Sequence, residues 1–429
     1  MIRVGWAIAI LLGMGLAPLA HGADFKVGAA FRVVTPDPLL PISGGMDIPK
    51  PAKEKKGELF ARAVVMEQGE TRVAFVCLDF IGWPRVQGDK IRAKVTDIPK
   101  ENILIGSTHT HSAPESYAFP DGKGGHTADL PYLDSVIDKA AEAINEAVAN
   151  LQPAVLKINM DEAKGKIAYN YYAPELYDPR CSVLQAIGKG GKKDGKAIVT
   201  FVNYASHPEV MGSKQGIVSP DFCGPLYDRI EEKTGGMAFF MNGAQGGMVT
   251  ADCRGPVDGE DIQNWDECIR IGQLLADEAL RIVDAAPVQE SPSLFVTAAE
   301  VPFPLDSPIM RQVLENSPLD YRQYLKGNDV MTQMNLVNVG TAQMLTIPGE
   351  ALPNIGYYLK RKMPTSHPFL LGLTNDAMGY ILTPEDFGSF GRYEYVSETS
   401  MGEYTGEVLI DESLKLVEAS PKPDTPAAK

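Results

Sequence analysis

Short apolar runs with the composition of β-strands alternate along the chain with segments whose apolar residues recur at helical spacing. The strand-like runs are rich in Val, Ile, Phe and Leu and occupy residues 72–80, 196–205, 237–241, 342–350 and 367–375. Runs of this length and composition predict buried strands. Strands that alternate with helices are typical of an α/β protein, so we expect mixed β-sheets flanked by helices.

The clearest helical pattern lies at residues 130–151, where apolar residues recur every three or four positions. Asp129 precedes this segment and Pro131 lies in its first turn, and both are start signals for a helix. The segments 225–235 and 266–286 are expected to form two further helices.

Residues that bind metals or exchange protons follow several of the predicted strands. They are Asp79, His109 with His111, His207 and Glu350. In open α/β sheets, ligands bind beyond the carboxyl ends of the strands, so we expect these side chains to form one site at those ends. Loops are polar in general, which explains the Asp well but explains the histidines and the Pro-Gly-Glu segment less well.

The composition limits the classes of protein to which the chain can belong. It has 429 residues, of which 44% are hydrophobic and 22% charged, as in an ordinary globular protein. Its formal net charge of −15 argues against a nucleic-acid partner. Its five cysteines permit disulfides, but their spacing matches no zinc ribbon and their odd number leaves at least one thiol unpaired.

The two ends of the chain differ from the rest. Residues 1–23 have the features of a cleaved signal peptide: Arg3, an apolar stretch over 6–19, and small residues near Gly22. The apolar stretch is short for a membrane span, so we favour removal over anchoring and expect a secreted or periplasmic protein. Residues 418–429 are polar and rich in Pro and Ala, and we expect a disordered tail.

Two of the six histidines, His109 and His111, lie one residue apart, just after the apolar run 103–105. If a strand continued through both, its period of two would point both imidazoles to the same side. A catalytic zinc uses about three nitrogen or oxygen ligands and leaves a position open for water. His109, His207 and Glu350 would supply such a set, although their spacing is not a local zinc motif.

A glycine-rich loop at 242–255 follows the predicted strand 237–241. Its glycines let backbone N–H groups approach a ligand, so the loop could form an oxyanion pocket or present a nucleophile such as Thr250. The loop has neither a P-loop lysine nor a GxSxG motif, so ATP binding and common serine-hydrolase chemistry are not supported. A glycine-rich turn without a function is the alternative.

Several of these segments together resemble the catalytic domain of the neutral (non-lysosomal) ceramidase family. GSTHTHSAP is similar to the family's GTHTHSGP signature, and SHPEVMG is similar to its second histidine segment. TIPGEAL resembles the family's PGE segment, and GLTNDAMGYILTPEDF and RYEYVS resemble its tyrosine-containing stretches. The segments keep the family's order, so the resemblance implies a catalytic domain over residues 24–417 and a bound zinc ion.

The resemblance also implies roles for individual residues. The positions that match the family's zinc ligands are His109, His207, Glu350 and Tyr380. His111 matches a histidine near the reacting carbonyl, and Tyr393 matches a second active-site tyrosine. Thr250 stands where the family has a nucleophilic serine. Threonine can act as a nucleophile, but its β-methyl group narrows the approach, so direct attack by a metal-bound water is the alternative. Tyr171 stands where the family has an arginine, so contacts with the substrate are expected to differ.

The sequence therefore predicts an exported, zinc-dependent hydrolase that cleaves the amide bond of an N-acylsphingosine or a related N-acyl lipid. The alternatives are a metal-dependent esterase or amidase that acts on a smaller substrate, and a non-catalytic zinc-binding protein. The family's C-terminal immunoglobulin-like domain has no counterpart in this sequence, which also leaves the substrate open. The expected partner is a small molecule or a lipid, and membrane-surface contact and oligomeric state are left open.

Overall fold

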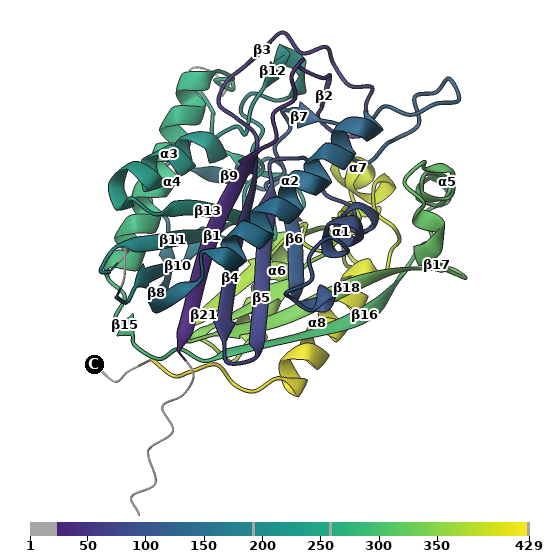
Figure 1. The fold of residues 1–429 in the computed structure, drawn as a ribbon. Helices are drawn as coiled ribbons and strands as arrows, with labels where there is room; N and C mark the ends of the chain where they lie inside the picture. Colours follow the sequence, from purple (N-terminus) through teal and green to yellow (C-terminus); the bar gives the residue numbers. More distant parts are fainter. Residues whose placement is uncertain (1–23, 191–193, 257–259, 427–429) are drawn as a thin grey trace, which may run out of the picture.

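The computed structural model describes residues 24–190, 194–256 and 260–426, and it has the predicted mixed α/β architecture (Figure 1). The predicted signal peptide lies outside the described residues. The larger sheet has nine strands in the order β13-β11-β10-β8-β1-β4-β5-β6, with β15 paired to β8. Their bounds are β1 Phe25–Val33, β4 Phe60–Gln68, β5 Thr71–Leu78, β6 Ile103–Ser107, β8 Gln152–Glu162, β10 Arg180–Gly188, β11 Ala197–Tyr204, β13 Met237–Asn242 and β15 Val288–Gln289.

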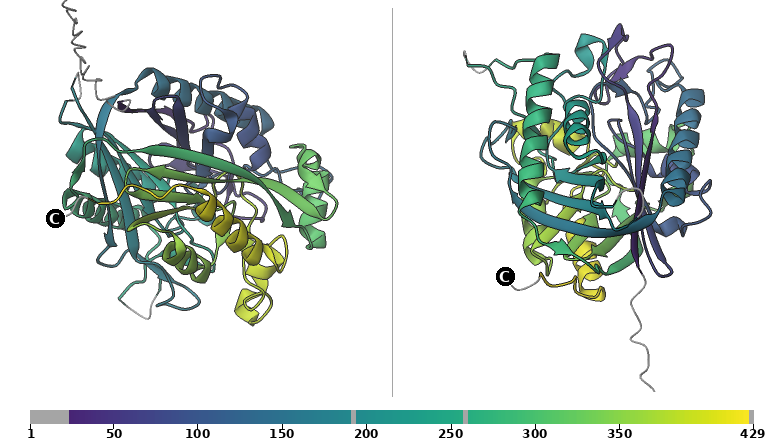
Figure 2. Two further views of the ribbon diagram at one scale, coloured as in Figure 1. Left: turned by 90° about the horizontal axis from the view of Figure 1, so that it is seen from below. Right: turned by 60° about the vertical axis from the view of Figure 1, so that its left-hand side comes forward.

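The smaller sheet has five strands in the order β16-β18-β19-β21, with β17 paired to β18. Their bounds are β16 Leu294–Pro304, β17 Leu325–Lys326, β18 Asp329–Val339, β19 Ala342–Thr346 and β21 His367–Leu371. The two sheets are stacked (Figure 2), and their facing sides share one apolar core that contains Phe75, Phe201, Met344 and Phe369.

Helices cover the outer faces of both sheets. On the larger sheet, α2 (Leu130–Ala149) packs on β1 and β4, and α3 (Cys223–Thr234) and α4 (Trp265–Asp284) pack near β13 and β10. On the smaller sheet, α6 (Pro353–Lys362) packs on β21 and α8 (Thr405–Ala419) on β16. The remaining short elements are α1 Arg85–Arg92, α5 Pro308–Asn316, α7 Glu394–Glu398, β2 Ile42–Ser43, β3 Glu54–Lys55, β7 Ala113–Pro114, β9 Ala168–Asn170, β12 Ile217–Val218, β14 Val249–Ala251, β20 Glu350–Ala351 and β22 Tyr380–Ile381.

The predicted strands and helices are present, and α2 begins as its sequence predicts. The Asp129 side chain accepts a hydrogen bond of 2.9 Å from the Tyr132 N–H, which satisfies a donor of the first turn. None of the described helices is long and apolar enough to cross a membrane. All five cysteines are buried free thiols.

The C-terminal tail differs from the expectation of disorder. Helix α8 extends to Ala419, and the Asp424 carboxylate then accepts hydrogen bonds of 2.8 and 2.7 Å from the N–H and hydroxyl of Ser293. The Asn338 side chain donates to the Pro421 carbonyl over 2.7 Å. The polar composition of the tail could not reveal these partners, because Ser293 lies more than a hundred residues earlier in the chain.

The strand ends that carry the candidate site are joined by a buried amide. Asn242, the last residue of β13, donates through Nδ2 to the carbonyl oxygens of Thr108 and Ser206 over 3.0 and 2.8 Å. Its Oδ1 accepts from the N–H groups of Ser206 and Gly243 over 3.1 and 2.9 Å. Thr108 and Ser206 directly precede His109 and His207. One side chain therefore positions both histidine-bearing loops.

We predict that Asn242→Asp lowers the free energy of unfolding by about 2–5 kcal/mol, because it replaces two buried donors by an oxygen that faces two carbonyl oxygens. Asn150→Asp is the matched control, since Asn150 is exposed and water replaces its bond to Ala29 O; its change should be below about 1 kcal/mol. Denaturant titration measures both values. Equal losses in the two variants would contradict the role given to Asn242.

Asp79, which follows β5, gives a pH-dependent prediction. Burial raises the pKa of its carboxyl to about 7, although the Phe60 N–H and Arg62 oppose the rise. The folded state therefore holds a proton that the unfolded chain releases near pH 4, so stability should fall by at most about 4 kcal/mol between pH 4 and 7. Asp79→Asn should flatten this part of the pH–stability curve. An unchanged slope in the variant would refute the assignment.

Candidate metal centre

Three histidines from two loops converge at the carboxyl ends of β6 and β11. The ring centroids of His109 and His207 lie 4.6 Å apart, and those of His109 and His111 lie 4.8 Å apart. One ring nitrogen from each of the three residues lies within 4.8 Å of the other two, so the triad could hold a metal ion. The structure thus adds His111 to the donors expected from the sequence.

The two histidines of the THTH segment converge, but not for the reason that the sequence suggested. Strand β6 ends at Ser107, and His109 has a backbone φ of +72°, in the left-handed region. The His109 N–H donates to Phe80 O over 2.9 Å, and the His111 N–H donates to Pro208 O over 3.1 Å. A turn anchored to two other loops therefore brings the imidazoles together, and strand alternation does not.

Glu350, in β20, completes the cluster. Strand β20 follows β19 of the smaller sheet along the chain. Its Oε2 lies 3.1 Å from His207 Nε2 and 3.4 Å from His109 Nε2. Gly246 of the glycine-rich loop packs directly against this segment, since a Cβ added there would lie 2.2 Å from Glu350 O. The Gly246 N–H donates to Ala351 O over 2.9 Å, so this glycine serves close backbone packing.

Each of the two ligand-like imidazoles is oriented by a backbone carbonyl. His109 Nδ1 lies 2.5 Å from Ile81 O, and His207 Nδ1 lies 2.7 Å from Val249 O. A carbonyl oxygen only accepts, so Nδ1 carries the proton in both rings. In its neutral form, each ring then presents the lone pair of Nε2 to the centre, as in most metal-binding histidines.

The spacing of the donor atoms fits a small tetrahedral ion. Two ligands that are each about 2.1 Å from a tetrahedral zinc lie about 3.4 Å from one another. His109 Nε2 lies 3.4 Å from Glu350 Oε2 and 3.3 Å from His111 Nε2. Imidazole nitrogens and a carboxylate oxygen are also the donor types that zinc prefers, so the residues present fit the ion.

The electrostatics of the cluster favour a cation at its centre. Burial lowers the pKa of His111 to about 3, so this ring is neutral at physiological pH. Burial acts to lower the pKa of His207, but the hydrogen bond to Glu350, the charges of Glu209 and Glu350 and the Val249 carbonyl together outweigh burial and raise the pKa to about 9. Burial opposes ionisation of Glu350, yet His109 and His207 hold its pKa well below the usual range. The buried Glu350 carboxylate thus favours a positive charge beside it, either on His207 or on a metal ion.

The two expected tyrosines take different positions. Tyr380 pairs with Glu350 between β22 and β20 and lines the pocket at the metal centre. The Tyr393 ring instead packs against Tyr172 and Phe390, at centroid distances of 5.7 and 5.6 Å. Tyr393 is not among the residues that line this pocket.

Tyr395, two residues further on, takes a different position from Tyr393. It lines the pocket, and its ring centroid lies 6.0 Å from that of Tyr380. Burial and the Glu350 charge raise its pKa to about 12, so its hydroxyl remains a donor. The sequence offered both tyrosines in the segment RYEYVS, and only their directions in the fold distinguish them.

Thr250 lies beside the cluster and is linked to it by a residue that the sequence pattern did not single out. Its backbone forms a bridge with His207. Its hydroxyl donates a hydrogen bond to the Glu209 carboxylate, and Glu209 Oε2 lies 3.7 Å from His111 Nδ1. Glu209 follows His207 by two residues, and this short spacing could have identified it from the sequence as a residue of the site. It connects the expected nucleophile with the third histidine.

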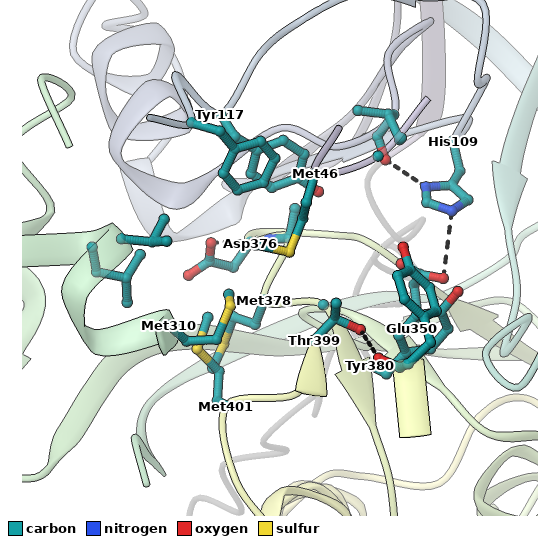
Figure 3. Close-up of a pocket in the computed structure, with 18 of the residues that line it drawn as sticks. Met46, His109, Tyr117, Met310, Glu350, Asp376, Met378, Tyr380, Thr399 and Met401 are labelled. Atoms are coloured by element: carbon teal, nitrogen blue, oxygen red, sulfur yellow. Dashed lines mark hydrogen bonds and ion pairs between the residues drawn. The ribbon is translucent and has the colours of Figure 1, made fainter. Parts of the chain in front are cut away.

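An apolar pocket extends from the metal centre, as Figure 3 shows. In Figure 3, His109, Glu350 and Tyr380 lie at one end, and Met310, Met378 and Met401 lie at the other. The lining also includes Met46, Tyr117, Phe119, Leu314, Tyr321 and Val330. A ligand that reaches the metal centre therefore meets mostly apolar walls along the pocket.

Comparison with solved structures gives a match over almost the entire chain. The crystal structure of neutral ceramidase from Pseudomonas aeruginosa matches with a TM-score of 0.72 and 17% sequence identity, covering 95% of this chain and 77% of that one. A structure of ceramidase complexed with C2 matches with the same values. No family model matches the sequence. The protein thus has the fold of neutral ceramidase, with a buried histidine triad that could hold a metal ion.

Proposed function

We propose that this protein is a zinc-dependent hydrolase that cleaves the amide bond of an N-acyl lipid, such as an N-acylsphingosine, into a fatty acid and an amine. The observation that carries the proposal is the junction of a His–His–Glu cluster with an apolar pocket. The likeness in fold to neutral ceramidase, and to the ceramidase that is complexed with C2, supports the lipid substrate.

His109 Nε2, His207 Nε2 and Glu350 Oε2 would hold the zinc, with Tyr380 beside them. When bound, zinc supplies a Lewis acid at the scissile carbonyl and lowers the pKa of a bound water. The site is buried, which excludes bulk water and strengthens each polar interaction within it.

Thr250 is the proposed nucleophile: its hydroxyl oxygen would form an ester with the acyl group as the amide C–N bond breaks, and water would then hydrolyse this ester to release the fatty acid. Glu209 accepts its hydroxyl hydrogen bond, which orients the oxygen and places a carboxylate where the hydroxyl proton leaves. His111 is neutral and its Nδ1 lies 3.7 Å from Glu209 Oε2, so it would relay to the leaving amine the proton that Glu209 receives from Thr250. The Tyr395 hydroxyl would stabilise the negative charge on the carbonyl oxygen, the kind of role that the resemblance implied for Tyr393.

The pocket favours a lipid over the smaller polar substrates considered from the sequence, since most of its walls are apolar. Met46 and Tyr395 line it and are 37% and 47% exposed, and Phe390 is 63% exposed. These side chains would contact a membrane surface from which a lipid enters. Export through a cleaved signal peptide is part of the same proposal.

The hydrolysis itself is tested with a short-chain fluorescent N-acylsphingosine. Purified protein reconstituted with zinc should release fatty acid, and a chelator should abolish the release. A protein that binds zinc but cleaves neither this substrate nor any other N-acyl lipid would overturn the proposed function.

We predict that His109→Ala reduces both bound zinc and hydrolysis by at least about 100-fold, because it removes the imidazole that lies between His111, His207 and Glu350 in the cluster. Metal analysis and initial rates measure the two effects. His126→Ala is the matched control, since His126 lies in a loop outside the cluster and the pocket. If His109→Ala keeps its zinc, the assignment of the ligands is wrong.

We predict that Thr250→Ala lowers kcat by about 1,000-fold or more with zinc content unchanged, because the attacking oxygen is lost. Thr250→Ser keeps the hydroxyl and should retain at least a tenth of kcat. Burst kinetics would show the acylated protein in the Ser variant and not in the Ala variant. Full activity of Thr250→Ala would exclude Thr250 as the nucleophile.

A further inference from the structure

The apolar pocket contains a carboxyl group that the proposed chemistry does not use. Asp376, in the loop between β21 and β22, is only 5% exposed and lines the pocket. In Figure 3 its carboxyl lies apart from His109 and Glu350, among the methionines of the opposite end. It therefore faces the part of a ligand that is remote from the scissile bond.

Only one oxygen of this carboxyl is used by the backbone. Oδ1 accepts from the N–H of Arg85, the first residue of α1, over 3.0 Å, and from the N–H of Ala377 over 2.9 Å. The Thr332 hydroxyl lies beside the group and has no hydrogen-bond partner among the described residues. A carboxylate oxygen accepts two hydrogen bonds, so Oδ2 keeps capacity for a donor within the pocket. Holding the start of α1 requires Oδ1 alone.

A plain alkyl chain is a poor partner for this end of the pocket. It would remove water from Oδ2 and offer no hydrogen bond in return, and a buried polar group without a partner is costly. Burial already raises the pKa of Asp376, although the hydrogen bonds from the N–H groups of Arg85 and Ala377 act to lower it. A chain that carries one hydroxyl would satisfy Oδ2 while its methylene groups contact residues such as Met310 and Met378.

We propose that Asp376 is a specificity residue that selects chains bearing a hydroxyl group away from the scissile amide. This inference rests on the proposed function, because it takes the pocket as the site of the lipid chain. The ligand class it names is a hydroxylated fatty acyl or long-chain amine group. Sites that are built to bind a hydroxyl discriminate strongly against analogues that lack it.

Equilibrium binding tests the inference without requiring hydrolysis. The probes are decanoic acid and its mono-hydroxy and mono-oxo derivatives at each successive carbon, titrated calorimetrically into the zinc-reconstituted protein at pH 8. At one carbon or two neighbouring carbons, the hydroxyl should tighten binding about 10- to 100-fold over decanoic acid, and the oxo group should not.

Asp376→Asn is the diagnostic variant, because its Oδ1 still accepts from Arg85 and Ala377 while Oδ2 becomes an NH₂ donor. At the preferred carbon, the oxo derivative should gain at least 10-fold relative to the hydroxy derivative. Asp386→Asn is the matched control, since Asp386 is a partly buried carboxyl outside this pocket. It should leave the order of affinities unchanged.

Three results would overturn the inference: no hydroxyl position binds more tightly than decanoic acid, the preference survives unchanged in Asp376→Asn, or no chain binds at all. Hydrolysis of N-decanoylsphingosine is measured in parallel. If that amide is cleaved without any preference for a hydroxyl, the proposed function holds and the role of Asp376 does not. If a hydroxyl-dependent affinity appears without hydrolysis of any amide, the pocket assignment holds and the catalytic proposal fails.

Discussion

The structure depends on the buried carboxamide of Asn242, which binds the main chain of the residues that precede His109 and His207. Because this amide is fully buried, each of its bonds must be made, and they are made only when β6, β11 and β13 end at the same level. The backbone of two loops is thereby fixed before any ligand is present. The Nε2 atoms then face Glu350 at distances that suit a shared ion.

The candidate site separates chemical roles along one pocket. Charged and ionisable groups lie at the end formed by the larger sheet's loops and β20, where the donor atoms converge. Methionine, leucine and aromatic side chains form most of the remaining walls, and Asp376 adds a second carboxyl at a distance from Glu350. A ligand with a polar group at one end and a long apolar chain matches this distribution.

Much of the fold and part of the site could be predicted from the sequence. Periodicity located β5, β11, β13 and α2, because buried strands and amphipathic helices leave local patterns. The chemistry of His109, His207 and Glu350 identified residues that the fold does bring together. These residues lie close together because they follow strands that end at the same edge of the structure. The rule that ligands bind beyond the carboxyl ends of strands was sufficient to predict this.

The rest of the site and the tail could not be predicted, because local sequence does not determine the side-chain directions and long-range contacts on which they depend. His109 has a left-handed backbone and is bonded to the carbonyl oxygens of Phe80 and Ile81. Strand alternation therefore correctly predicted that the two imidazoles converge, but it is not the cause of their convergence. Tyr395 lines the pocket and Tyr393 does not, although both lie in the same short segment, and the tail is hydrogen-bonded because Ser293 lies beside Asp424.

The proposed chemistry requires a metal ion held by these histidines and Glu350, and X-ray absorption at the zinc edge of the purified, reconstituted protein tests for it. We expect about one zinc per chain, with two or three imidazole nitrogens and a carboxylate oxygen around it. Absence of bound metal, or a zinc coordinated by thiolates, would contradict the proposed centre.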